Sequence, residues 1–217
     1  MFDLIKRDFG RYASLDGLEG HQGFFENLRV FIESPGMQAV LVYRFGSWIN
    51  RTVRFRPLRK FLKLIYHLLD KLCIVLWGIH IDDGAEIGGG LYIGHFSGVL
   101  IGPVKMGVDC NLAHQVTIGR RGDGRGGVPV LGDRVWIGMG SVIFGGVHIG
   151  DGVTIGPLTV VARNLPPGAL VSGNPMRLLR KNYDNSMEIY GAAVAERRKA
   201  LSGVAPRPLV IKPHDDR

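Results

Sequence analysis

The sequence predicts a parallel β-helix, a solenoid in which short strands coil around an apolar interior. Of the 32 glycines in the 217 residues, 24 fall between Gly78 and Gly173. Aliphatic residues recur there at every sixth position, and glycine often follows them. A period of six fits neither the 3.6-residue period of a helix nor the two-residue period of a strand. The residues expected to point inward are Ile81, Ile87, Ile93, Leu100, Met106, Leu112, Ile118, Leu131, Ile137, Ile143, Ile149, Ile155 and Val161.

Each hexad is interpreted as a short strand followed by a tight corner, where a small or polar residue relieves crowding. Three hexads complete one triangular coil of about 18 residues, and strand pairing stacks successive coils about 4.8 Å apart. The register is displaced by one residue between Ile93 and Leu100.

Helices are expected on both sides of the solenoid. Apolar residues recur at helical intervals in segments 23–34 and 37–51, and Pro57 opens a third helix over 58–77. After the last coil, the prolines of 166–168 and 174–175 turn the chain away, and a final helix is expected over 186–201. The organisation is therefore a helical region at 1–77, a β-helix at 78–181 with an extruded loop at 120–129, and a C-terminal helix and tail at 182–217.

Composition excludes several classes of protein. The formal charge of +8 could suit a nucleic-acid binder, but no zinc-ligand spacing or aromatic RNA-binding signature accompanies it, so no nucleic-acid partner is expected. The only two cysteines, Cys73 and Cys110, cannot form a disulfide framework. The N-terminus lacks the apolar run of a signal peptide, and charges interrupt segment 61–77. We expect a cytoplasmic protein.

Segment 51–71 carries seven basic residues and one acidic residue, interleaved with apolar side chains. Such a segment could lie peripherally on the inner, anionic membrane surface. Alternatively, it could pack against other copies of the chain with its charges in solvent. The sequence leaves both interpretations open.

The histidines are informative because a β-helix does not need them. His95 and His114 each occupy the third position of a hexad and lie 19 residues apart, which places them on one corner of successive coils. His80 lies just before the first hexad. A single such residue would suggest a surface histidine, whereas a stacked pair within a break in the repeat favours a functional site. No metal site is expected, because no further histidine has a suitable spacing.

The loop 120–129 (RRGDGRGGVP) interrupts the repeat between Ile118 and Leu131. Its glycines and proline predict extrusion beside the coil that carries His114. Arg120, Arg121 and Arg125 make it a candidate clamp for an anionic substrate group. The alternative is a solvated loop without a ligand.

The hexad register, the extruded loop, the segment 172–180 (SGNPMRLLR) and the segment 35–48 (PGMQAVLVYRFGSW) resemble the hexapeptide-repeat acyltransferases. Within that family the sequence is most similar to the serine acetyltransferases and their polysaccharide-modifying relatives. The resemblance implies a left-handed β-helix, a homotrimer, and acetyl-CoA lying along the groove between adjacent β-helices. It also implies that His95 is the general base.

By the same resemblance, the coenzyme contacts match Met139, Pro157, Ala162, Arg163, Arg177 and Arg180. Backbone groups at the corner glycines are expected to hydrogen-bond the pantetheine amides, and the N–H groups there to stabilise the developing oxyanion. The sequence departs from the serine acetyltransferases where His80 and Gly94 replace two aspartates, Ser47 replaces a histidine, and Val128 or a neighbour replaces a loop histidine. The changes at His80 and Gly94 remove the carboxylates that hold an amino-acid acceptor.

We therefore expect an acetyl-CoA-dependent O-acetyltransferase that acts on a saccharide hydroxyl in cell-surface polysaccharide biosynthesis. His95 would be the base, and His80 or His114 would orient it or hold the sugar. Neither cysteine is placed to carry an acyl group. The alternatives are a serine O-acetyltransferase, an N-acetyltransferase acting on an amino sugar, and a non-catalytic β-helix scaffold.

Overall fold

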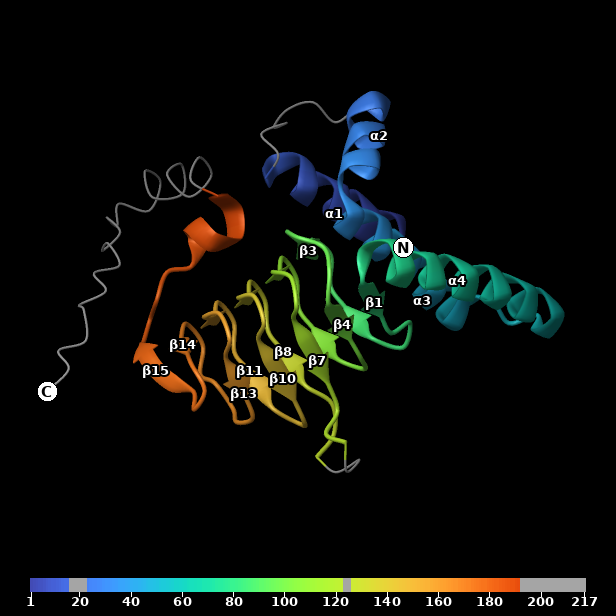
Figure 1. Ribbon diagram of the computed structural model, residues 1–217. Coiled ribbons are helices and arrows are strands. Elements are labelled where there is room, and N and C mark those ends of the chain that lie inside the picture. Colours follow the sequence, from blue (N-terminus) through green and yellow to red (C-terminus); the bar gives the residue numbers. More distant parts are fainter. Residues whose placement is uncertain (16–22, 123–125, 192–217) are drawn as a thin grey trace, which may run out of the picture.

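The computed structural model describes residues 1–15, 23–122 and 126–191. Four helices precede the solenoid: α1 (Phe2–Leu15), α2 (Phe24–Glu33), α3 (Pro35–Thr52) and α4 (Arg56–Trp77). Figure 1 shows these helices gathered at the first coil and the parallel strands stacked beyond them. The β-helix expected from the six-residue period is confirmed.

The strands form the three faces of the solenoid, and every pair is parallel except the last. The first face contains β1 (Ile79–Ile81), β4 (Val99–Ile101), β7 (Thr117–Gly119), β10 (Val142–Phe144) and β13 (Val160–Val161). The second face contains β2 (Glu86–Ile87), β5 (Lys105–Met106), β8 (Val130–Leu131) and β11 (His148–Ile149). The third face contains β3 (Tyr92–Ile93), β6 (Asn111–Leu112), β9 (Trp136–Ile137), β12 (Thr154–Ile155), β14 (Leu170–Ser172) and β15 (Arg177–Arg180).

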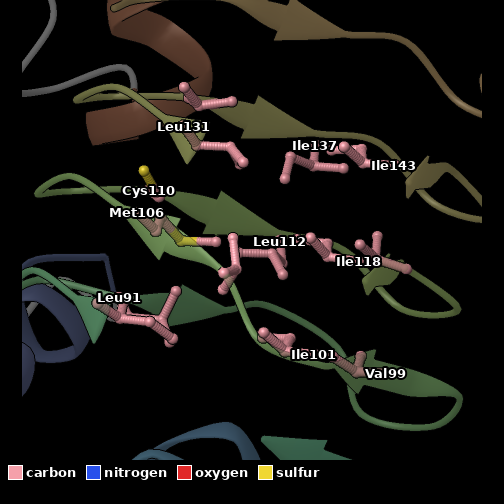
Figure 2. Packing of buried hydrophobic residues seen from close by; sticks show 14 of the residues in the cluster. Leu91, Val99, Ile101, Met106, Cys110, Leu112, Ile118, Leu131, Ile137 and Ile143 are labelled. Carbon is pink, nitrogen blue, oxygen red and sulfur yellow. The ribbon is translucent and has the colours of Figure 1, made fainter. Parts of the chain in front are cut away.

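The interior is a continuous column of aliphatic side chains, part of which Figure 2 shows. Ile93, Leu112, Ile137 and Ile155 occupy equivalent positions on the third face and are almost completely buried. Removing such side chains from water is the main stabilising contribution to the fold.

The prediction was wrong for one of the residues expected to point inward. Leu100 is 48% exposed, whereas Ile101 is fully buried and pairs in register with Ile81 and Ile118. The corner before this strand is longer than a hexad allows, because Ile101 lies eight positions after Ile93 instead of six, and Ser97 and Gly98 within it both adopt positive φ angles. Three consecutive aliphatic residues then left the inward position ambiguous in the sequence.

The predicted exit from the solenoid also needs correction. Residues 166–168 form a corner rather than an exit, because β14 continues the third face by pairing with β12. The chain leaves at the cis Asn174–Pro175 peptide and returns as β15, antiparallel to β14. Beyond it, helix resumes at Ser186 and is described to Gly191. The rest of the helix predicted over 186–201 lies outside the described residues.

The helix α1, which the sequence did not predict, fixes the helical region to the first coil. Asp8 accepts hydrogen bonds from the N–H groups of Gly90 and Leu91, at 2.7 and 3.2 Å. It also forms a buried ion pair with Arg44 of α3, at 2.9 Å. The Arg44 guanidinium donates to the Ile87 carbonyl at 2.6 Å. Both buried charges are therefore paired, as a buried charge must be.

The close approach of α3 and the end of α4 both depend on glycine. A Cβ on Gly36 would lie 2.5 Å from the Ile93 carbonyl oxygen, so only glycine lets α3 reach β3 so closely. Gly78 ends α4 in the left-handed conformation at φ 65°, which glycine adopts without steric cost. None of the helices in the described part of the chain is long and apolar enough to cross a membrane.

Candidate functional site

His95 and His114 lie together on one corner of the solenoid. They follow β3 and β6, in which Ile93 pairs with Leu112. Their ring centroids are 5.9 Å apart, with the planes at 70°. His95 is exposed, whereas His114 is partly buried. The stacking expected from their spacing is confirmed, and it gives this corner two neighbouring imidazoles.

The same corner continues down the solenoid through two residues that the sequence assigned to the coenzyme. Met139 follows β9 and Pro157 follows β12, each in the position that His95 and His114 occupy on the earlier coils. The N–H of Gly140 donates to the His114 carbonyl at 3.1 Å, and the N–H of Leu158 donates to the Met139 carbonyl at 2.8 Å. We call the row His95, His114, Met139 and Pro157 the histidine edge.

The N–H groups of the three corner glycines next to this edge do not fit the expectation that they bind the developing oxyanion. The N–H of Gly94 donates to the Leu112 carbonyl at 3.0 Å, and that of Gly138 donates to the Ile155 carbonyl at 2.8 Å. The N–H of Gly156 makes the same kind of bond to the following coil. These donors hold successive coils together, so they are already engaged and cannot serve a ligand without disrupting the ladder.

A cavity of about 300 Å³ opens beside His95. Its walls come from α1, from the α2–α3 junction and from the His95 corner, and include Tyr12, Glu33, Ser34, Tyr92, His95 and Phe96. We call it the His95 cavity. Glu33, the last residue of α2, forms an exposed ion pair with Arg29 at 3.0 Å. No sequence pattern singles out Glu33, because only tertiary packing brings α2 to this corner.

The walls of this cavity are held by specific contacts. The Ile93 N–H donates to the Tyr12 hydroxyl at 3.0 Å, and the Tyr12 and Tyr92 rings lie 4.7 Å apart. On the other side, Trp77 at the end of α4 contacts the edge of Phe96, with 5.6 Å between ring centroids. Helices from both sides thus fix the corner that carries His95.

His80 lies on β1, with its Nδ1 3.0 Å from Oδ1 of Asp70 in α4. The sequence leaves open whether His80 or His114 orients His95 or holds the acceptor. The ring contact of His95 is with His114, and His80 is half-buried against α4. Asp70 was missed because nothing in the helical pattern of α4 sets it apart from a surface carboxylate.

The remaining coenzyme-matched residues lie near the last coil. Ala162 and Arg163 follow β13 and are exposed, and Arg163 donates a long hydrogen bond of 3.4 Å to the Met176 carbonyl. That carbonyl immediately precedes Arg177 of β15, which is exposed, and Arg180 ends the same strand. The three arginines therefore belong to the end of the solenoid farthest from the helices.

The extruded loop leaves the first face after β7 and returns at β8, as predicted. Arg120 and Arg121 are exposed. The Arg121 side chain lies close to Gly145, at the end of β10. Arg125 lies outside the described residues.

The two cysteines are poor nucleophiles. Burial raises the pKa of Cys110 to about 12 and also raises that of Cys73. A thiol with such a pKa remains protonated near neutrality, and the thiolate is the reactive form. Within residues 1–15, 23–122 and 126–191, no group of three histidine, cysteine or acidic residues is arranged to hold a metal ion.

Comparison with known proteins agrees with this geometry. Residues 129–163 match the bacterial transferase hexapeptide family model (six repeats). A serine acetyltransferase of Helicobacter pylori (strain ATCC 700392 / 26695) is 36% identical over 155 residues, which cover 70% of this chain and 86% of that protein. The serine acetyltransferase of Mycobacterium tuberculosis (strain ATCC 25618 / H37Rv) is 34% identical over 155 residues, 70% of this chain and 64% of that protein.

Solved structures of serine acetyltransferases share the fold. The Vibrio cholerae enzyme superposes with a TM-score of 0.70 at 22% identity, covering 87% of this chain and 69% of that chain. The soybean enzyme, solved with serine, gives a TM-score of 0.64 at 26% identity, with coverage of 82% and 68%. These relatives support the serine alternative more than the expected saccharide acceptor. Together with the solenoid and its histidine edge, they show that the chain belongs to the hexapeptide-repeat acyltransferase family, which includes the serine acetyltransferases.

Proposed function

We propose that this protein is an acetyl-CoA-dependent O-acetyltransferase with His95 as its general base. The observation that carries the proposal is the histidine edge, which aligns His95 and His114 with Met139 and Pro157. Three coil spacings separate His95 from Pro157, roughly 14 Å. An extended pantetheine arm laid along this edge would direct its thioester towards His95. One related serine acetyltransferase structure is a complex with CoA, at 21% identity.

The proposed reaction is direct transfer. The neutral His95 imidazole removes the proton from an acceptor hydroxyl as its oxygen attacks the thioester carbonyl carbon. A carbon–oxygen bond forms, and the tetrahedral intermediate then collapses with cleavage of the carbon–sulfur bond. The imidazolium returns its proton to the departing thiolate, which gives free CoA and the acetyl ester. Neither buried cysteine takes part.

L-Serine is the acceptor that the relatives favour, because the Helicobacter pylori and Mycobacterium tuberculosis relatives are serine acetyltransferases. A zwitterionic amino acid requires a negative and a positive partner. Glu33 lines the His95 cavity, and Arg29 is paired with it. Glu33 would provide the negative partner for the ammonium group, although it is not one of the carboxylate positions expected from the resemblance.

A saccharide hydroxyl is the second candidate acceptor. It is favoured by His80 and Gly94, which stand where the resemblance expects the aspartates that hold serine. The partly exposed Tyr92 ring also borders the cavity. Aromatic rings present an apolar body with a polar tip, which suits a sugar.

Release of free thiol from acetyl-CoA, with L-serine and a saccharide panel as acceptors, tests the chemistry. We expect His95→Ala to lower the rate with the productive acceptor about 10²–10⁴-fold, because general-base catalysis typically contributes that much. His148→Ala, an exposed histidine on the second face, is the matched control. Unchanged turnover in His95→Ala would overturn the proposed base. If the wild type neither turns over nor binds acetyl-CoA, the scaffold alternative holds.

A substitution of Glu33 distinguishes serine from a saccharide as the acceptor substrate. If serine is the substrate, Glu33→Gln should raise the KM for serine at least tenfold while changing the acetyl-CoA KM little, because one charged hydrogen bond is lost. Glu86→Gln, an exposed carboxylate on β2, is the control. Turnover with a saccharide and none with serine would instead establish the second candidate.

We also propose that the chain acts as a homotrimer. Leu100, Met139 and Leu158 are 48%, 45% and 69% exposed around the histidine edge and the first face. Neighbouring copies would cover these apolar side chains and complete the coenzyme groove. Light scattering of the purified protein measures the mass directly, and a monomeric mass at working concentration would contradict the trimer.

A further inference from the structure

The helix α4 carries an unusually apolar exposed surface. Among its 22 residues only Tyr66 and Cys73 are buried. Five large apolar side chains recur at intervals of three or four residues and are exposed by 46% or more: Phe61, Leu64, Leu68, Leu72 and Val75. This spacing places them on one side of the helix, and we call them the α4 stripe.

A basic row runs along α4 beside this stripe. Arg56, Lys60 and Lys71 are exposed, and their positions at i, i+4 and i+15 put them about a quarter turn from the stripe. Arg56 and Lys60, together with His67, line a shallow cavity of about 510 Å³. Two of the three basic residues of the row therefore lie at a concave surface.

No carboxylate is exposed on α4. Its single acidic residue, Asp70, is turned towards His80 and is only 15% exposed. Arg51 and Arg54, just before the helix, add two further exposed basic side chains. The stripe and the row therefore present apolar and positive surface side by side.

From this arrangement we infer that α4 binds an anionic lipid surface. The stripe would enter the boundary between headgroups and acyl chains, and the basic row would bind lipid phosphates. Such binding scales with buried apolar area and with attraction to anionic lipids. A second copy of this chain, packed with its α4 stripe against the stripe of the first, would bring the two basic rows close together. Repulsion between these rows disfavours a second copy as the binding partner. Anionic lipid complements both features.

The position of α4 connects this surface with the candidate site. Trp77, its last residue, contacts Phe96 of the His95 cavity, and Asp70 contacts His80. Figure 1 shows α4 extending from the first coil away from the rest of the solenoid. A bilayer bound along the stripe would hold the His95 cavity close to the lipid surface.

Vesicle flotation of the full-length protein tests the inference. One set of vesicles contains equal phosphatidylglycerol and phosphatidylcholine, and the other contains phosphatidylcholine alone. We expect flotation with the anionic vesicles only, and weaker binding as salt is raised. Lys60→Gln combined with Lys71→Gln should weaken binding roughly 30-fold, because each lysine near an anionic surface contributes about a fivefold factor. Lys6→Gln with Lys105→Gln removes the same charge from exposed positions elsewhere and should bind like the wild type.

A triple change in the stripe, Phe61→Ser with Leu64→Ser and Leu68→Ser, should abolish flotation. Light scattering and circular dichroism accompany each variant. No binding of the wild type to anionic vesicles would overturn the inference, as would equal loss in both lysine pairs. A stripe variant that lowers the oligomer mass, while the α4 lysine pair binds vesicles normally, would show that another copy covers the stripe.

Discussion

The candidate site combines one residue from an irregular corner with one from a regular corner. His95 lies in a corner that is two residues longer than a hexad and contains the positive φ angles of Ser97 and Gly98. His114, one coil further, lies in the regular corner and stacks beside His95. Both histidines can be recognised in the sequence, because His95 lies where the repeat is interrupted and His114 occupies the equivalent position of the next coil. Glu33 carries no such signal, because it ends an ordinary amphipathic helix.

The cysteines give a prediction at this scale. Burial holds the pKa of Cys110 at about 12, so both thiols stay protonated at neutral pH. We expect the Cys73→Ala, Cys110→Ala double variant to keep its rate of acetyl transfer. Mass spectrometry after incubation with acetyl-CoA should show no acetylated cysteine in the wild type. An acetyl-cysteine adduct formed and consumed at the turnover rate would contradict direct transfer.

At the scale of elements, the helices are positioned by buried polar contacts with the first coil. The Asp8 carboxylate joins α1 to β3 and, through Arg44, to α3. Tyr12 and Gly36 then bring the same two helices against Ile93. These contacts set the walls of the His95 cavity, so the stability of α1 docking and the shape of the cavity are linked.

Asp8→Ala should therefore be strongly destabilising. It leaves Arg44 as a buried charge without its carboxylate, and such changes typically cost about 3–5 kcal/mol. Chemical denaturation measures the loss, and limited proteolysis should show earlier cleavage within α1. The matched control is Glu86→Ala, which removes one partner of an exposed ion pair with Lys105 at 3.4 Å and should change stability little. Equal stability of the two variants would contradict this account of α1.

At the scale of the whole molecule, the two flanking segments meet on the solenoid. Arg11 of α1 donates to the Asn111 side-chain oxygen at 3.0 Å, and the Asn111 amide donates to the Glu188 carbonyl at 3.0 Å. Arg11 also donates to the Ile189 carbonyl and lies over the Tyr190 ring, 4.6 Å from its centroid. A helix from each end of the described chain is thus tied to β6.

Asn111→Ala should loosen this connection. It removes the shared partner of α1 and of the C-terminal segment, and leaves buried groups without hydrogen bonds, a loss of about 1–3 kcal/mol. We expect a lower thermal midpoint and faster proteolysis after Tyr183, with the strand signal in circular dichroism retained. Thr117→Ala, a partly buried polar residue on the outer side of β7, is the control. If proteolysis after Tyr183 is unchanged, Asn111 does not hold the C-terminal segment.

The sequence by itself determined the parallel coils, the bounds of three of the four helices before them to within about two residues, and the stacking of His95 on His114. Those features follow from periodicity, because a solenoid repeats one local conformation and its contacts lie a fixed number of residues apart. Tertiary structure alone decided the burial of Ile101 in place of Leu100, the return of β14 to the solenoid, the engagement of the corner N–H groups, and the meeting of Glu33 with the His95 cavity. Each of these depends on contacts between segments that no period relates, and only packing in three dimensions brings such segments together.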